Sequence, residues 1–391
     1  MQYDFDTIIE RRGSGDLMHE ALKPRWGRDD LQPLWVADMD FAVCPEILDA
    51  LRHRLDHPIL GYTVEPEDYF PAIHDWVLIH HQWDIKREWL SFIPGIVKGI
   101  GLVCNIFLKP DEKVVVMPPV YHPFFLTPRG NHREVVWNPL IRREAGYYDM
   151  DFEGLERVCD DKCRLLILCN PHNPGGICWT RETLSRLADF CYDHHLLVIS
   201  DEIHCDMALF GHRHIPFANV SEKAADISIT FQSPTKTFNI AGIITSHAIV
   251  PNKELRDRFY GWLKANELDE AHIFAHIATI AAFRKGEEWR RQMLAYVEDN
   301  IRFVEDYCRE HISGIRPLRP QASFLVWLDC RDLHLSHEAL LDLFIDKAHL
   351  ALNDGEMFGP GGEGFMRLNV GSPREYIRQA LEKLAKAVKA Q

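Results

Sequence analysis

The chain has 391 residues, and its 44 Lys and Arg against 58 Asp and Glu leave a net charge of −14. That acidic balance argues against a nucleic-acid partner or an anionic membrane surface, because both are bound through clustered basic residues. No run in the sequence reaches the roughly 20 apolar residues of a membrane helix, and residues 1–12 lack the apolar stretch of a signal peptide. We therefore expect a cytoplasmic protein without nucleic-acid or membrane partners.

The ten cysteines and 21 histidines bear on disulfides and metals. No CxxC pair occurs, and a chain of this length does not need a disulfide framework, so reduced thiols are expected. The adjacent pairs His80-His81 and His194-His195 are poorly placed to share one ion, and no third ligand accompanies His212 and His214. The sequence therefore predicts no metal site.

Short apolar runs alternate with amphipathic stretches through the middle of the chain, which is typical of βα units around a mostly parallel sheet. The run Leu165–Leu168 is continuously apolar, as expected for a strand buried on both faces. Thr180 is a candidate N-cap for a helix with one apolar stripe. The predicted strands are Lys113–Met117, Glu134–Trp137, Arg164–Cys169, Leu196–Ser200, Asp226–Phe231 and Ile243–Val250.

The pattern changes after about Ala282, where spacings of three and four predict a long helix from Glu287 to about Glu310. Later strands and helices alternate in a way that predicts a smaller α+β domain. We predict an α/β fold with helices on both faces of the main sheet, an N-terminal segment (1–45) beside the small domain, a large domain (46–284) and a C-terminal small domain (285–391). The later elements are strands at Phe324–Leu328 and Phe365–Val370 and helices at Ser336–Lys347 and Pro373–Val388.

Three polar motifs follow predicted strands, and open α/β sheets bind ligands outside the carboxyl ends of their strands. Lys236 lies in Ser233-Pro-Thr-Lys236 after one strand, and Asp201 opens Asp201-Glu-Ile-His204 at the end of another. Asn173 belongs to a turn rich in proline and glycine, Asn170–Gly176. Each motif taken alone also fits an ordinary surface lysine, a capping carboxylate or a structural turn.

Two further features favour an anionic ligand. The segment Pro94–Gly101 is rich in glycine and leads into an apolar helix, whose free N–H groups suit a phosphate. It matches neither a Walker loop nor GxGxxG, which disfavours an NTPase or a dehydrogenase. Arg367 lies on a late strand, where its fork can grip a carboxylate or form a structural ion pair.

Taken in this order, the motifs resemble the fold-type-I enzymes that use pyridoxal 5′-phosphate (PLP), the aspartate aminotransferase superfamily. The resemblance covers nearly the whole chain and implies a homodimer with active sites at its interface and an amino acid as substrate. It implies that Lys236 carries the cofactor as a Schiff base and moves protons. It also implies a role for Tyr121 in stacking on the cofactor ring and in catalysis.

The remaining roles follow from the same resemblance. Asp201 pairs with the pyridine nitrogen, Asn173 bonds the phenolic oxygen, and His204 belongs to the same cofactor site. Arg367 binds the substrate α-carboxylate, and Asp38 is placed with it at the substrate. Phosphate contacts are implied for Val97, Lys98 and Ser233, and for Tyr62, which reaches the phosphate and the substrate from the other subunit.

Within the superfamily, the chain is most similar to the cystathionine β-lyase branch of C–S lyases. This is carried by Leu34–Phe41 (LWVADMDF), by His204 where aminotransferases have tyrosine, and by the absence of arginine from 237–245. One departure concerns substrate preference, since Met18-His19 stands where the branch commonly has Lys-Trp. The expected activity is β-elimination of a thiol from a cysteine thioether, with pyruvate and ammonia as products. An aminotransferase, or a PLP-binding regulator, remains as an alternative.

Overall fold

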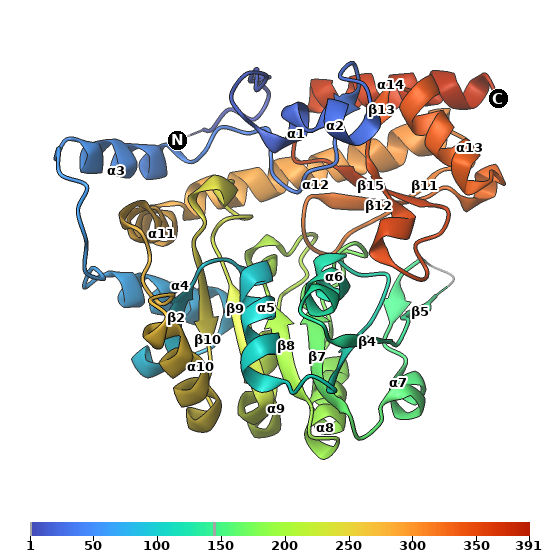
Figure 1. Cartoon of the computed structure of the whole chain (residues 1–391). Helices are drawn as coiled ribbons and strands as arrows, with labels where there is room; N and C mark the ends of the chain where they lie inside the picture. Colours follow the sequence, from blue (N-terminus) through green and yellow to red (C-terminus); the bar gives the residue numbers. More distant parts are fainter. Residues whose placement is uncertain (1, 144–145) are drawn as a thin grey trace.

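The computed structural model describes residues 2–143 and 146–391 (Figure 1). Its main sheet has the strand order β2-β10-β9-β8-β7-β3-β4. Strand β10 alone runs opposite to the other six strands, so the predicted mostly parallel sheet is confirmed. The strands are β2 (Leu90–Ile93), β3 (Lys113–Val116), β4 (Glu134–Trp137), β7 (Cys163–Cys169), β8 (Leu197–Asp201), β9 (Ser228–Gln232) and β10 (Ser246–Ile249).

Helices cover both faces of this sheet because its strands are apolar on both sides. Val114, Leu165 and Ile167 join one buried cluster with side chains of α5, α6 and α10, whereas Leu166 and Leu168 join another with α7, α8 and α9. The helices are α5 (Ile96–Phe107), α6 (Pro123–Gly130), α7 (Phe152–Val158), α8 (Arg181–Asp193), α9 (Glu222–Ile227) and α10 (Lys253–Ala265).

Two local predictions about this layer have different outcomes. The Thr180 hydroxyl accepts a hydrogen bond from the Thr183 N–H, so the predicted cap of α8 is confirmed. The strand predicted over Ile243–Val250 begins only at Ser246. A short 3₁₀ turn at Ala241–Ile243 and the left-handed backbone of Ile244 (φ 51°) precede it, and neither conformation can join a β-ladder.

A second, antiparallel sheet has the order β11-β12-β15-β14. It packs on α12 (Glu287–His311), the predicted long helix, whose apolar stripe from Trp289 to Cys308 is buried in one core with α14 (Arg374–Lys389). The predicted helix at Ser336–Lys347 is split into α13 (His337–Asp342) and a π-helical stretch (Leu343–Lys347). The strands are β11 (Arg316–Leu318), β12 (Leu325–Asp329), β14 (Asn353–Asp354) and β15 (Phe365–Asn369).

The N-terminal segment lies against the second sheet (Figure 1). Its strand β1 (Gln32–Pro33) pairs in parallel with β13 (Leu350–Ala351), and α1 (Leu17–Glu20) and α2 (Leu22–Trp26) share a small core with β13. The domain boundaries near residues 46 and 285 stay a prediction. The other elements are α3 (Pro45–Leu55), α4 (Tyr69–His81), β5 (Ile141–Arg142), β6 (Tyr148–Asp149) and α11 (Ile273–Lys285).

Within the described residues, no helix is both long and apolar enough to cross a membrane. All ten cysteines are free thiols.

Candidate active site

A cavity of about 340 Å³ opens at the carboxyl ends of β7, β8 and β9. This is the edge at which the three strand-end motifs were predicted to meet, because neighbouring parallel strands end on the same side. Seven of the residues predicted for the site line the cavity together. They are Val97, Lys98, Tyr121, Asn173, Asp201, His204 and Lys236.

Lys236 lies on the turn that follows β9. Its Nζ donates a hydrogen bond to the Ala37 carbonyl oxygen at 2.5 Å. Burial lowers the pKa of this amine, although the nearby carboxylates of Asp38 and Asp201 act in the opposite direction. A lowered pKa increases the share of unprotonated amine, which is the form that attacks a carbonyl carbon or accepts a proton.

Asp201 ends the neighbouring strand β8, lines the same cavity and is 5% exposed. Its Oδ1 accepts a hydrogen bond from the Ile203 N–H at 3.0 Å, and the carboxylate forms no ion pair with any described residue. Burial, and to a lesser extent the charge of Glu202, raises the pKa of Asp201 to about 7. A buried carboxylate without a cation is stabilised when a positively charged ligand group binds beside it.

The next residue, Glu202, forms a buried hydrogen-bond network beside Asp201. No role was predicted for it from the sequence. Its carboxylate is fully buried and accepts hydrogen bonds from Ser200, from the Phe217 N–H and from Gln232. His214 Nε2 lies 2.9 Å from Glu202 Oε2. His214 therefore serves this structural network, and neither it nor His212 forms a metal-ligand group with other described residues.

Arg367 projects from β15 and is 4% exposed. One Nη donates to Asn173 Oδ1 at 3.0 Å, and the other to Asn353 Oδ1 at 2.6 Å and to the Trp35 carbonyl oxygen at 3.1 Å. Its Nε has no partner among the described residues, and burial lowers the pKa of the guanidinium to about 10. A buried cation held by neutral oxygens alone is set up to bind a carboxylate.

A strap, residues 35–41, crosses beside the cavity and supplies the carbonyl groups that hold Arg367 and Lys236. Asn369 Nδ2 donates to the carbonyl oxygens of Val36 and Asp38. Asn239 Nδ2 donates to those of Met39 and Phe41. These two asparagines therefore fix the strap by its backbone. Neither asparagine was predicted from the sequence, although Asn239 lies only three residues after Lys236.

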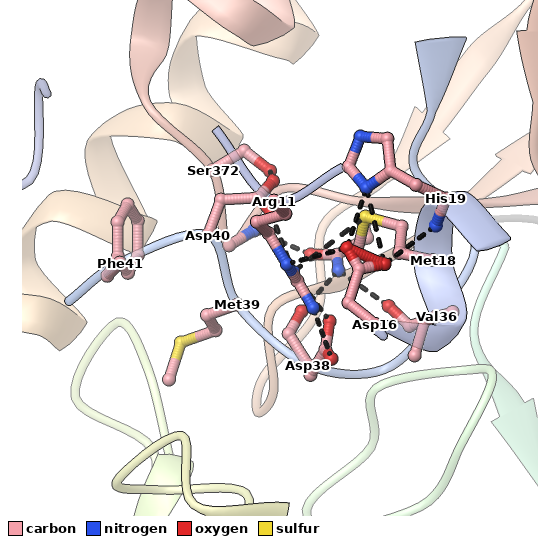
Figure 2. Close-up of polar contacts among 12 residues, drawn as sticks. Arg11, Asp16, Met18, His19, Val36, Asp38, Met39, Asp40, Phe41 and Ser372 are labelled. Atoms are coloured by element: carbon pink, nitrogen blue, oxygen red, sulfur yellow. Dashed lines mark hydrogen bonds and ion pairs between the residues drawn. The ribbon is translucent and has the colours of Figure 1, made fainter. Parts of the chain in front are cut away.

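Two acidic side chains of the strap, Asp38 and Asp40, are held by Arg11, which was also not predicted from the sequence. Figure 2 shows its guanidinium among the carboxylates of Asp16, Asp38 and Asp40, at 3.2, 2.9 and 2.8 Å. Ser372 also donates to Asp40, and Asp16 contacts His19. Asp38 was predicted to bind substrate. The structure turns its carboxylate to Arg11.

The other predicted residues have different surroundings. His204 is buried, its Nδ1 has no partner among the described residues, and burial lowers its pKa to about 3. Val97 and Lys98 lie in the first turn of α5, after Gly95, whose φ of 116° favours glycine. Ser233 is buried and donates to the Thr245 carbonyl oxygen. Tyr62 is fully exposed and is not brought to the cavity of its own chain.

Residues 33–384 match the family model described as aminotransferase class I and II. Cystathionine beta-lyase PatB of Bacillus subtilis is 39% identical over 98% of this chain and 100% of its own length. Protein MalY of Escherichia coli is 32% identical over 99% of each chain. The solved structure of cystalysin from Treponema denticola, which contains pyridoxal 5′-phosphate, superposes with a TM-score of 0.95 at 33% identity and covers 100% of both chains.

Proposed function

Because this chain belongs to the class I and II aminotransferase family, we propose that it is a PLP-dependent C–S β-lyase that releases a thiol, pyruvate and ammonia from L-cysteine thioethers. One observation carries the proposal: Lys236 and an unpaired, buried Asp201 line the same cavity, beside an arginine without an acid partner. The similarity to PatB over nearly the whole chain favours the lyase over the aminotransferase.

The residues present fit PLP by their charge. A pyridine nitrogen gains a proton more easily beside a carboxylate, and Asp201 is a buried carboxylate that lacks a cation. The first turn of α5 offers backbone N–H groups for a phosphate at the cavity wall. We assign Lys236 to the covalent link, and Val97, Lys98 and the Ser233 hydroxyl to the phosphate.

Three more residues complete the proposed cofactor contacts. Tyr121 lines the cavity with a mostly buried ring and is assigned to stacking. Asn173 is assigned to the phenolic oxygen, and its amide also holds Arg367. The unpaired Nδ1 of His204 is available for a further hydrogen bond at the same wall.

PLP, when bound, supplies an electron sink that stabilises negative charge at the substrate α-carbon. Arg367 receives the α-carboxylate through a fork already oriented by Asn173 and Asn353. Lys236, with its lowered pKa, removes the α-proton at Nζ. The strap holds Lys236 and Arg367 at a fixed separation, so the proton acceptor and the carboxylate site keep their relative positions.

We propose that the enzyme works as a homodimer in the cytoplasm. The segment after α3 exposes four large apolar side chains close together in sequence: Ile59, Leu60, Tyr62 and Val64. Such a contiguous apolar surface is typical of a protein interface. The partner's contact with this segment would place Tyr62 at the other subunit's phosphate and substrate.

The test is to incubate the holoenzyme with L-cystathionine and to measure pyruvate and free thiol together. Equal amounts of both products are expected. The Lys236→Ala variant should lose turnover by several orders of magnitude while it keeps the wild-type oligomeric state, because the amine assigned to the covalent link and to proton transfer is removed. Release of neither product, with a shift to the pyridoxamine spectrum when an amino acid is added, would establish an aminotransferase instead.

A further inference from the structure

A second arginine, Arg25, lies near the end of α2, and its positive charge acts on the guanidinium of Arg367. Its Cζ lies 4.6 Å from the ring centroid of Trp35 and 5.1 Å from that of Trp26. The two indole rings, which lie at 77° to each other, offer cation–π contacts to the guanidinium and no hydrogen-bond acceptor. Trp35 is also the residue whose carbonyl oxygen accepts from Arg367, so one strap residue contacts both arginines.

A chain of side-chain contacts joins the two guanidinium groups. An Nη of Arg25 lies 4.0 Å from Met357 Sδ, and Asn353 Nδ2 lies 3.2 Å from the same sulfur. The Oδ1 of Asn353 accepts from Arg367 at 2.6 Å. Arg25 is therefore linked to Arg367, at the proposed α-carboxylate site, through the side chains of Met357 and Asn353.

Neither arginine forms an ion pair within the part of the chain that the structure describes. Arg28, three residues after Arg25, shows the usual arrangement, with Asp30 and Asp346 as its partners. The neighbouring His122 also has no acidic partner, and its buried Nδ1 forms no hydrogen bond with any described residue. Burial, and then the positive charges of Arg367 and Arg25, lower the pKa of His122 to about 4. This corner carries repelling positive charge that a second anion would relieve.

We propose that Arg25 binds a second, distal carboxylate of the substrate while Arg367 binds the α-carboxylate. The preferred substrates are then cysteine thioethers whose leaving thiol itself carries a carboxylate, a class to which L-cystathionine belongs. This inference rests on the proposed function, because it places the thioether in the cavity beside Lys236. Arg25 acts on specificity and takes no part in proton transfer.

The test compares two thioethers of equal length on the holoenzyme: S-(2-carboxyethyl)-L-cysteine and its neutral carboxamide. Arg25→Gln should lower kcat/KM for the carboxylate substrate by roughly 5- to 10-fold, as expected for a charge-assisted contact at an exposed rim, and leave the carboxamide within about 2-fold. Arg25→Lys should retain part of the preference. Arg186→Gln is the matched control, since Arg186 is also exposed, stacks on a ring (Phe152, 4.1 Å) and forms no ion pair with any described residue.

Equal losses for the two thioethers in Arg25→Gln, or no loss for either, would overturn the assignment. Binding is measured separately by calorimetry of the holoprotein with L-2-aminopimelate, in which a methylene replaces the sulfur, and with L-2-aminoheptanoate, which lacks the distal carboxylate. We expect tighter binding of the dicarboxylate, lost in Arg25→Gln. If wild-type enzyme releases no pyruvate from any thioether, the lyase proposal fails, and this binding comparison still decides the role of Arg25.

Discussion

Replacing Asp201 by asparagine should stabilise the cofactor-free protein, although the same change should weaken cofactor binding. Asp201 is buried and forms no ion pair with any described residue, so its charged form is costly until a ligand binds. Asparagine has nearly the same shape and can still accept the hydrogen bond from the Ile203 N–H. It resembles the protonated acid, which is the form that the fold favours.

The magnitude follows from the pKa values. Burial raises the pKa of Asp201 from 3.8 to about 7. A carboxyl group with a raised pKa contributes stability that is complete below pH 3.8 and is lost as the pH rises through 7. Relative to Asp201→Asn, wild-type protein should be less stable by about 2 kcal/mol at pH 5 and by about 4 kcal/mol at pH 8. The difference between the two proteins should therefore grow with pH.

The assay is equilibrium urea unfolding of both cofactor-free proteins at pH 5 and pH 8, at one protein concentration because a dimer's stability depends on it. Asp161→Asn, in the exposed turn before β7, is the control and should show no gain at either pH. A gain from Asp201→Asn that is the same at both pH values would show that its charge is not the cause. Lower stability of the variant at pH 8 would refute the reasoning.

Two other substitutions test the support of the site. Asn353→Ala removes a hydrogen bond that orients Arg367, so KM should rise about 10-fold with kcat little changed. Steady-state kinetics should show this rise for carboxylate and neutral thioethers alike, and a rise confined to one of them would contradict the assigned role. In Gly355→Ala, the new Cβ would stand 2.1 Å from the Gly362 carbonyl oxygen, and urea unfolding should show a loss of about 3 kcal/mol or more. Gly261→Ala, inside the exposed part of α10 with nothing within 4 Å, should instead gain about 0.5–1 kcal/mol, and similar behaviour of the two variants would rule out crowding at Gly355.

The sheet and its helices could be predicted because their signals are local. The continuous apolar run of β7, and the apolar residues spaced by three and four along α12, each indicate burial within one short stretch of sequence. Strand β10 was placed approximately, since a left-handed Ile244 has no signature in sequence. The N-terminal elements were not predicted. They are short, and β1 exists only because β13, more than 300 residues later, pairs with it.

Four cavity residues, Asn173, Asp201, His204 and Lys236, could be predicted because they lie in motifs at the ends of strands. Tyr121, Val97 and Lys98, which line the same cavity, were predicted from the family resemblance. Arg11, Asn239 and Asn369 were missed, since they act by holding a strap that is distant in the sequence. Asp38 was identified but its partner was not. An aspartate looks the same in a sequence whether it faces a ligand or an arginine 27 residues earlier.

The strap determines when, during synthesis of the chain, the active-site cavity can form. Residues 35–41 are synthesised more than 300 residues before Asn369, which binds their backbone, and Arg367, which they hold. Domains fold as they emerge, so the main sheet can form around Lys236 and Asp201 well before the strap has anything to dock on. The cavity can therefore close only after Arg367 and Asn369 have been synthesised. Until then the strap stays loose, and nascent chains, or chains truncated before Arg367, should be cut there by proteases that leave the folded protein intact.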